Sequence, residues 1–228
     1  MTENKNYINV IYNKKDRPFT NYPDKLSKYL FDFFRLSEKD KILDVGCGRG
    51  EFLNGFMNCG LEPYAIDLSD ISKKTYPNIN FKYCDLLNEP IPFEDEFFDV
   101  IFSKSLIEHF HYPEKIFKEM NRVLKKNGKI ITMTPDWEIN YKNFYEDYTH
   151  RTPFSEISLR DFHLINGFKD VEIYKFKQLP ILWKQKNLQN SILKFFSEIT
   201  RIIVPDYFKK YKWVKFSKEI ILLSIAKK

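Results

Sequence analysis

Hydrophobic residues follow two different periods along the chain. Short apolar runs are typical of strands buried in a parallel sheet that is covered on both faces. Between these runs, apolar residues recur at the spacing of a helix face. Strands that alternate with helices in this way predict an α/β fold built from βαβ units. The expected strands are 41–45, 63–67, 81–85, 98–105, 129–134, 171–177 and 219–226, and the expected helices are 24–36, 51–59, 113–128 and 155–167.

Residue types at the helix ends support these limits. Asp24 and Ser155 are the expected N-caps of the first and last of these helices, because their side-chain oxygens can accept hydrogen bonds from unpaired backbone N–H groups. At the C-terminal ends, Gly60, Gly128 and Gly167 follow the last apolar positions of the second, third and fourth expected helices. Glycine adopts the left-handed backbone that commonly terminates a helix, so we expect each of these helices to stop there.

Residues 178–218 interrupt the alternation and predict a helical insertion before the last strand. The apolar positions of this segment fall on one face of a helix that ends at Pro205, and we expect this helix to pack as a cap. Basic amphipathic helices also bind membrane surfaces, so a peripheral membrane contact or a lipid-linked substrate is the alternative. The apolar positions are Leu188, Ile192, Phe195, Phe196, Ile199, Ile202 and Ile203.

The net charge of +6 is unevenly distributed. Residues 169–228 contain 14 Lys and Arg against 5 Asp and Glu, whereas residues 1–168 contain 23 against 26. A basic segment is compatible with an acidic partner such as a phosphate, a nucleic acid or a lipid surface. The interpretation we favour is a solvated surface on a lysine-rich protein.

Cysteine usage and the absence of long apolar runs restrict the class of protein. Cys47, Cys59 and Cys84 form no C-x-x-C pair, which argues for a reducing compartment and against a disulfide scaffold or a zinc site. No secretory signal is evident, and no run reaches the ~18–20 apolar residues of a spanning helix. We expect a cytoplasmic protein with a single domain over 1–228 that begins with an N-terminal arm, 1–23.

The first strand leads directly into a glycine-rich loop, in the sequence "KILDVGCGRGEF" from Lys41 to Phe52. Three of the seven glycines of the chain, Gly46, Gly48 and Gly50, lie here. Glycines at the carboxyl end of a parallel strand let the backbone approach a ligand closely. Their spacing is neither that of the dinucleotide fingerprint nor that of a phosphate-binding loop.

Three acidic residues accompany this loop at the ends of neighbouring strands. Asp44 lies within the first strand, where a carboxylate is costly unless it is paired. Asp67 ends the second strand, where an acid commonly binds the two hydroxyls of a ribose. Asp85 ends the third strand and could accept a hydrogen bond from an adenine amine. Together they indicate a nucleoside ligand with positive charge; the alternative is that they are turn residues.

These residues resemble the motifs of the class I S-adenosylmethionine-dependent methyltransferases, in particular the small-metabolite and glycan-pathway branch. "ILDVGCGRGEF", "AIDLS", "CDLL" and "IPFEDEFFDVIFSKSLIEHF" match the first four motifs, and "MNRVLKKNGKIIT" matches a helix and the fifth strand. The resemblance covers residues 20–177 and the last strand. It implies a Rossmann-like seven-stranded sheet of order 3-2-1-4-5-7-6 with the last strand antiparallel and helices on both faces.

The resemblance also implies the cofactor, S-adenosyl-L-methionine (SAM), which becomes S-adenosyl-L-homocysteine, and the residues that hold it. Asp44 and the loop of Gly46, Cys47, Gly48 and Gly50 would hold the methionine moiety. The other expected contacts are Asp67 to the ribose, Leu68 beside the adenine, Asp85 and Leu86 to the adenine ring, and Ser103 under the sulfonium and amino group.

Catalytic candidates follow the fourth strand. His109 is a candidate general base, because imidazole titrates near neutral pH, and Glu108 lies beside it. The alternative is that both only shape the pocket. Some relatives carry E-x-x-E-H here and bind a divalent ion, but Ser105 stands at the position of the first glutamate. We therefore expect no metal, although Glu108, His109 and His150 could still form a three-ligand site.

The acceptor is expected to lie near "YEDYTHRTPFSEISL", which resembles a D-x-T-H-x-R segment of glycan and metabolite methyltransferases. Tyr148, His150 and Arg151 would face the acceptor, and Arg151 could bind a phosphate or carboxylate. As an alternative, Arg151 pairs with Glu146 or Asp147 at the surface. Tyr12 and Arg17, in the N-terminal arm, could close over the cofactor.

Three functions compete on these grounds. The first is a methyltransferase that modifies a hydroxyl or amine of a small molecule, a sugar or nucleotide-sugar of surface-glycan or secondary metabolism. The second is an RNA or protein methyltransferase, although no recognition module is evident and nucleic acid is not the expected partner. The third is a catalytically silent partner protein that binds the cofactor. We expect a monomer or a homodimer.

Overall fold

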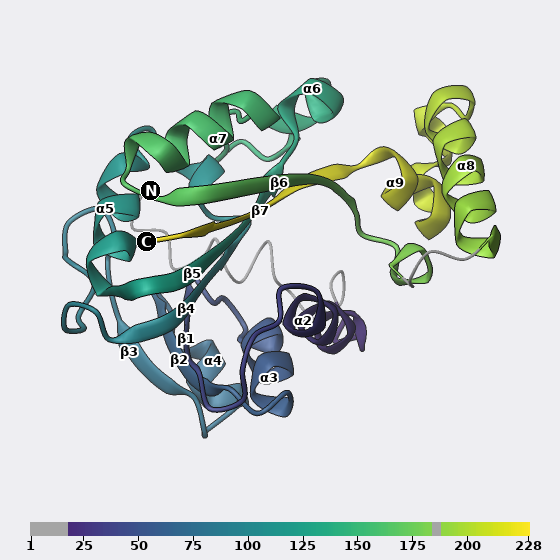
Figure 1. Ribbon diagram of the computed structural model, residues 1–228. Helices are drawn as coiled ribbons and strands as arrows, with labels where there is room; N and C mark the ends of the chain where they lie inside the picture. The colour runs from purple at the N-terminus through teal and green to yellow at the C-terminus, as the bar shows by residue number, and fades with distance from the viewer. Residues whose placement is uncertain (1–17, 184–187) are drawn as a thin grey trace.

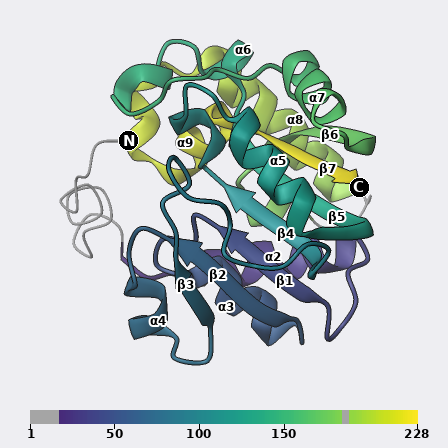
Figure 2. The same cartoon turned by 90° about the vertical axis from the view of Figure 1, so that its left-hand side faces the viewer.

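Seven strands form one sheet in the order β3-β2-β1-β4-β5-β7-β6. The computed structural model describes residues 18–183 and 188–228, and Figure 2 shows the strands from β3 at one edge to β6 at the other. The neighbours from β3 to β5 are parallel, whereas β7 is antiparallel to both β5 and β6. The predicted fold class and strand order are therefore confirmed. The strands are β1 (Lys41–Val45), β2 (Glu62–Asp67), β3 (Asn80–Tyr83), β4 (Phe98–Lys104), β5 (Leu124–Pro135), β6 (Lys169–Lys177) and β7 (Ile220–Lys227).

Helices cover both faces of this sheet and enclose two hydrophobic cores (Figure 1). On β1, Leu43 and Val45 face the core that includes α5 and α7, and Ile42 faces the core that includes α2 and α3. Side chains alternate along a strand, so Asp44 lies on the face of Ile42. The helices are α2 (Tyr22–Phe33), α3 (Glu51–Asn58), α4 (Ile71–Thr75), α5 (Glu114–Val123), α6 (Trp137–Asn140), α7 (Glu156–Ile165), α8 (Leu188–Ile203) and α9 (Lys212–Lys218), and the 3₁₀ helices are Ile107–His109, Phe144–Glu146, Pro180–Leu182 and Asp206–Lys210.

Three of the predicted helix ends are correct. Ser155 caps α7, where its side chain accepts a hydrogen bond from the N–H of Ser158 in a reciprocal capping box. Gly60 follows α3 and Gly167 follows α7, both with positive φ, as expected of residues that stop a helix.

The predicted helix over 113–128 is wrong at its C-terminal end. α5 stops at Val123, and the chain is already extended at Leu124, where β5 begins. The backbone carbonyls of Arg122 and Val123 accept hydrogen bonds from the N–H groups of Glu96 and Phe97, which divert the chain into the sheet. Gly128 therefore lies within β5 and does not end a helix.

Two other limits also differ from the prediction. α2 begins at Tyr22, so Asp24 lies in its first turn and Asn21 occupies the N-cap position. β3 ends at Tyr83, so Asp85 lies in the following turn, not on the strand.

The insertion contains α8, which contacts α9, and Figure 1 shows this pair beyond the ends of β6 and β7. The apolar residues Ile192, Phe195, Phe196, Ile202 and Ile203 of α8 are exposed. Among the described residues, no helix is both long and apolar enough to span a bilayer.

A buried histidine joins α7 to the sheet. His163 is fully buried, and its Nε2 lies 2.9 Å from the hydroxyl of Ser224 on β7. Burial lowers the pKa of His163 from 6.5 to about 3, because the cationic form cannot be hydrated there.

This pKa predicts acid sensitivity that His163→Gln should reduce. Below pH 6.5 the unfolded chain binds a proton that folded His163 does not bind until about pH 3, so the stability of the folded state falls as pH falls. Between pH 7 and pH 5 the wild type should lose about 2 kcal/mol more than the variant. Urea unfolding at both pH values measures this loss. The exposed His111→Gln is the control, and equal losses in wild type and His163→Gln would contradict the assignment.

Candidate functional site

The glycine loop turns sharply between β1 and α3. Gly46, Gly48 and Gly50 all have positive φ, between 52° and 77°. A Cβ on Gly46 would lie 2.6 Å from Leu106 Cδ1, and one on Gly50 would lie 2.8 Å from Ser72 Cβ. A Cβ on Gly48 would meet nothing within 4 Å. The left-handed backbone favours glycine at all three positions, the packing of Ser72 adds a steric restriction at Gly50, and Gly48 borders open space among the described residues.

Two carboxylates lie beneath this loop. Asp67 accepts hydrogen bonds from the N–H groups of Gly48 and Ser69, both at 2.9 Å. Asp44 is only 3 % exposed. Burial raises the pKa of Asp44 to about 8, with a further contribution from Asp67, while Lys104 acts in the opposite direction. Burial also raises the pKa of Asp67. The loop therefore covers an acidic centre that a positively charged ligand would stabilise.

The other expected cofactor residues occupy the same edge of the sheet with different exposures. Ser103 is fully buried at the end of β4, and its hydroxyl has no partner among the described residues. Leu68 is 40 % exposed. Asp85 already caps its own turn, with Oδ1 accepting from Leu87 N–H and Oδ2 from the Asn88 amide. Cys47 is buried, and its Sγ lies 3.3 Å from Ser72 Oγ; Leu86 packs against the core.

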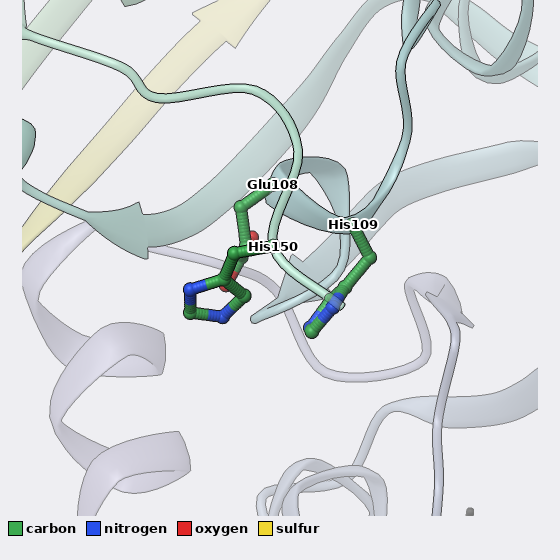
Figure 3. Close-up of side chains that lie close together, drawn as sticks. All are labelled: Glu108, His109 and His150. Atoms are coloured by element: carbon green, nitrogen blue, oxygen red, sulfur yellow. The ribbon is translucent and has the colours of Figure 1, made fainter. Parts of the chain in front are cut away.

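Three side chains from two segments meet beyond the end of β4 (Figure 3). Glu108 and His109 come from the 3₁₀ helix Ile107–His109, and His150 comes from the segment between β5 and α7. The ring centroids of His109 and His150 are 4.8 Å apart, edge to face. Each residue offers one metal-ligating atom, and these atoms lie within 4.8 Å of one another. The structure thus brings together the three residues that the sequence suggested for catalysis.

Backbone hydrogen bonds hold the two segments together. The carbonyl oxygen of Glu108 accepts from the N–H of Arg151 at 2.7 Å and from that of Thr152 at 3.1 Å. The hydroxyl of Thr152 also donates to the Phe110 carbonyl at 2.6 Å. His150 is therefore fixed beside His109 by the backbone of its own segment.

Burial determines the protonation of this cluster. Glu108 has no exposed surface, and burial raises its pKa to about 7. Burial lowers the pKa of His109 to about 4, and the neighbouring His150 contributes in the same direction. At pH 7 the imidazole of His109 is therefore neutral and presents a lone pair.

Several residues that orient the cluster were not identified from the sequence. Thr134, on β5, donates its hydroxyl to Glu108 Oε2 at 3.0 Å. Thr149 contacts Nδ1 of His109 at 2.8 Å and donates its own hydroxyl to Asp147 at 2.6 Å. Asp147 and Thr149 stand at the D and T positions of the D-x-T-H segment, although their role beside His109 was not predicted. No sequence motif marks Thr134, because its contact with Glu108 joins segments far apart along the chain.

The residues expected to face the acceptor are at the surface. Tyr148 is 64 % exposed, and Arg151 is also exposed. The guanidinium of Arg151 donates to the carbonyls of His150 and Tyr148. Within the described part of the chain, no ion pair joins Arg151 to Glu146. Tyr12 and Arg17 lie outside the described residues.

Comparison with known proteins supports one chemistry for this edge of the sheet. Residues 43–132 match the family described as "Methyltransferase domain". This range contains the glycine loop, Asp44, Asp67 and Asp85, and the Glu108–His109 pair. The chain is an S-adenosylmethionine-dependent methyltransferase.

Relatives and solved structures agree with this assignment. The methyltransferase is 26 % identical over 134 residues to the sterol 4-C-methyltransferase strm-1 of Caenorhabditis elegans, covering 54 % of this chain and 40 % of that one. Its fold is similar to that of a SAM-dependent methyltransferase from Archaeoglobus fulgidus, with TM-score 0.67, 20 % identity, and coverage of 96 % and 99 %. Phosphoethanolamine N-methyltransferase 2 of Haemonchus contortus, in complex with SAM, has TM-score 0.63 and 18 % identity, with coverage of 90 % and 52 %.

The residues at this edge fit SAM as the cofactor of the methyltransferase. SAM carries a cationic sulfur, an ammonium group and a ribose. A buried acid pair, open space over Gly48 and the buried hydroxyl of Ser103 without a described partner match a ligand with these groups.

The raised pKa of Asp44 predicts that the acid pair costs stability when no ligand is present. Between pH 4 and pH 8 folded Asp44 binds a proton that the unfolded chain does not, so the stability of the folded state decreases as pH rises. Asp44→Asn should remove a cost of up to about 4 kcal/mol at pH 7. Urea unfolding of ligand-free protein at pH 5 and pH 8 tests this, with the exposed Asp70→Asn as control. A variant no more stable than wild type at pH 8 would contradict a buried, strained carboxylate.

Proposed function

We propose that the enzyme transfers the methyl group of SAM to a hydroxyl or amine of a small polar molecule, a sugar or nucleotide-sugar of surface-glycan or secondary metabolism. The observation that carries this proposal is the cluster of Glu108, His109 and His150 beyond the end of β4. A neutral imidazole in that position can accept a hydrogen bond from a hydroxyl. Proximity and orientation can then supply most of the rate enhancement.

The cofactor is held, in this proposal, by the edge that carries the glycine loop. Asp44 and the loop of Gly46, Cys47, Gly48 and Gly50 bind the methionine moiety. Asp67 binds the ribose, since each carboxylate oxygen accepts one backbone N–H and has a further lone pair. The exposed Leu68 contacts the adenine, together with Asp85 and Leu86, and the hydroxyl of Ser103 donates toward the methionine end.

Methyl transfer requires positioning and the removal of one proton. When bound, SAM supplies a methyl group on a positively charged sulfur. A nucleophile can attack the methyl carbon in line with the carbon–sulfur bond, and the sulfur is the leaving group. His109 accepts the proton of the acceptor hydroxyl, with its Nδ1 hydrogen-bonded to Thr149. Glu108 and His150 complete the wall on which the acceptor rests.

Arg151 and Tyr148 are proposed to bind the rest of the acceptor. The guanidinium of Arg151 is exposed and occupied only in part by backbone carbonyls, so it can turn toward a phosphate or carboxylate. A phosphorylated acceptor is consistent with the name of one structural neighbour, phosphoethanolamine N-methyltransferase 2. Tyr148 offers a sugar ring an exposed aromatic surface.

A panel of acceptors tests this proposal. The purified enzyme is incubated with SAM and, separately, with sugar nucleotides, RNA or a protein extract, and S-adenosylhomocysteine formation is measured. We expect turnover with a sugar nucleotide. Asp67→Ala should weaken the affinity for S-adenosylhomocysteine about 10- to 100-fold, because charge-assisted hydrogen bonds are lost.

Asp70→Ala is the matched control, because Asp70 is an exposed acid in the same connection and pairs with Lys74 at the surface. Turnover on RNA or protein alone would favour the competing enzymatic function. Binding of SAM without turnover on any acceptor would favour a catalytically silent partner protein. Unchanged ligand affinity in Asp67→Ala would exclude the proposed ribose contact.

The α8–α9 lobe, residues 188–218, suggests where the acceptor is found. The side of α8 that faces α9 is polar: Ser197 is fully buried and donates to Ser217 at 2.9 Å. Trp213 donates to Thr200 at 3.0 Å. The outward side is apolar, so α8 has the reverse of the usual polarity of a surface helix. The exposed apolar residues of the lobe are Ile192, Phe195, Phe196, Ile202, Ile203, Tyr207, Phe208 and Tyr211.

We infer that this lobe lies on an anionic lipid surface. An exposed apolar area of this kind is typical of a protein or membrane contact. The lobe also carries the exposed Lys194, Lys210, Lys212 and Lys215, and basic residues on an apolar helical surface are attracted to negatively charged headgroups. A lipid-linked acceptor would then reach the active site from the membrane.

Vesicle binding tests the lobe. Phe195→Gln/Phe196→Gln should bind phosphatidylglycerol-containing vesicles about 10- to 100-fold more weakly than wild type, because two exposed aromatic side chains no longer enter the interface. Tyr83→Gln, which changes an exposed aromatic residue on β3, is the control. Flotation of the wild type with phosphatidylcholine vesicles, and with the anionic vesicles at high salt, measures how much the attraction between lysines and headgroups contributes to binding. The proposed lipid contact would be excluded if the wild type does not float with the vesicles and sedimentation shows that it dimerises through the lobe.

A further inference from the structure

We propose that Glu108, His109 and His150 bind one divalent transition-metal ion beside the acceptor. The role of this ion in catalysis rests on the proposed function, whereas its binding does not. The ligand atoms of the three residues lie within 4.8 Å of one another, so a small inward movement of the side chains lets a single ion bind all three. Glu108 and His109 are buried and His150 is partly buried, so the surrounding protein shields most of the ligand set from water.

The hydrogen bonds of His109 define which of its nitrogens can bind the ion. The hydroxyl of Thr149 is donated to Asp147 at 2.6 Å, so its oxygen accepts from Nδ1–H of His109 at 2.8 Å. The lone pair of this imidazole is therefore on Nε2. A histidine that ligates a metal commonly donates its other N–H to an acceptor in this way.

His150 has the same arrangement with a different partner. Its Nδ1 lies 2.6 Å from the carbonyl oxygen of Phe144. A carbonyl can only accept, so Nδ1 carries the hydrogen and Nε2 carries the lone pair. Both imidazoles are thus held in the tautomer that a cation requires, by acceptors on the side away from the metal.

Glu108 supplies an independent indication of a ligand. Its Oε2 accepts from Thr134, but its buried Oε1 has no hydrogen-bond partner among the described residues. A buried carboxylate oxygen without a partner is costly. A metal ion between the carboxylate and the two imidazoles would satisfy it.

The donor set selects the kind of ion. Two imidazole nitrogens and one carboxylate oxygen suit Zn²⁺, Mn²⁺, Co²⁺ or Fe²⁺, whereas Mg²⁺ and Ca²⁺ prefer oxygen ligands alone. Three protein ligands leave open coordination positions, as is typical of catalytic and not of structural sites. The open positions can bind the hydroxyl of the acceptor.

The ion would change how the acceptor loses its proton. A coordinated hydroxyl has a lowered pKa and is a nucleophile at neutral pH. Its oxygen forms the bond to the methyl carbon, the electron pair of the broken carbon–sulfur bond stays on sulfur, and the proton passes to water. The metal is neither oxidised nor reduced. His109 then acts as a ligand in place of a general base.

Cobalt binding tests the site without an acceptor. Protein treated with a chelator and dialysed is titrated with Co²⁺, and the visible absorption of the bound ion is followed. We expect saturation at one equivalent. His150→Ala should bind at least about 100-fold more weakly, and Thr149→Val about 10-fold more weakly, because the partner that orients His109 is lost. His111→Ala, an exposed histidine two residues from His109, should bind like wild type.

The thermal shift produced by SAM is measured on the same samples. Absence of saturable Co²⁺ binding in the wild type, or wild-type binding in His150→Ala, overturns the metal site, and an intact SAM shift then leaves the proposed transfer standing. Normal Co²⁺ binding without a SAM shift would support the metal site and contradict the proposed methyl transfer from SAM. Once an acceptor is known, full turnover in chelated protein would return His109 to the role of general base.

Discussion

The carbonyl oxygen of Glu108 accepts two backbone N–H groups, from Arg151 and Thr152, and the acceptor side of the active site depends on these bonds. They join the segment that follows β4 to the segment that follows β5. Because both donors and the acceptor belong to the backbone, the connection tolerates changes in side chains. His150 can therefore lie beside His109 although 41 positions separate them in the sequence.

Much of the cofactor side was predictable, because its information is local. The glycines, Asp44 and Asp67 follow one another within two strands and the connection between them, and a parallel sheet collects strand ends at one edge. The strand order came from the resemblance of the motifs. The end of α5 was not predictable in this way, because the hydrogen bonds from Glu96 and Phe97 that divert the chain come from a distant turn. Thr134 was missed for the same reason.

The orientation of α8 illustrates a different limit. Its apolar face was read correctly from the spacing, but a helical pattern does not say which face is covered. In the structure, hydrogen bonds between Ser197 and Ser217 and between Thr200 and Trp213 turn the polar face toward α9. These polar contacts join α8 to α9, while Phe195 and Phe196 remain at the surface.

The position of β7 has a consequence for how the molecule assembles. β7 is the last strand along the chain, yet it lies between β5 and β6, and among the described strands β6 pairs with β7 alone. Until Ile220–Lys227 pairs, β5 presents an open edge and β6 cannot join the sheet. The α8–α9 lobe lies between β6 and β7 in the sequence, so it is synthesised before β7. Pairing of β7 with β6 is what brings the two ends of the lobe together. Completion of the sheet is therefore a late, long-range step, during which the exposed aromatic residues of the lobe and the open edge of β5 are both available for association with other chains.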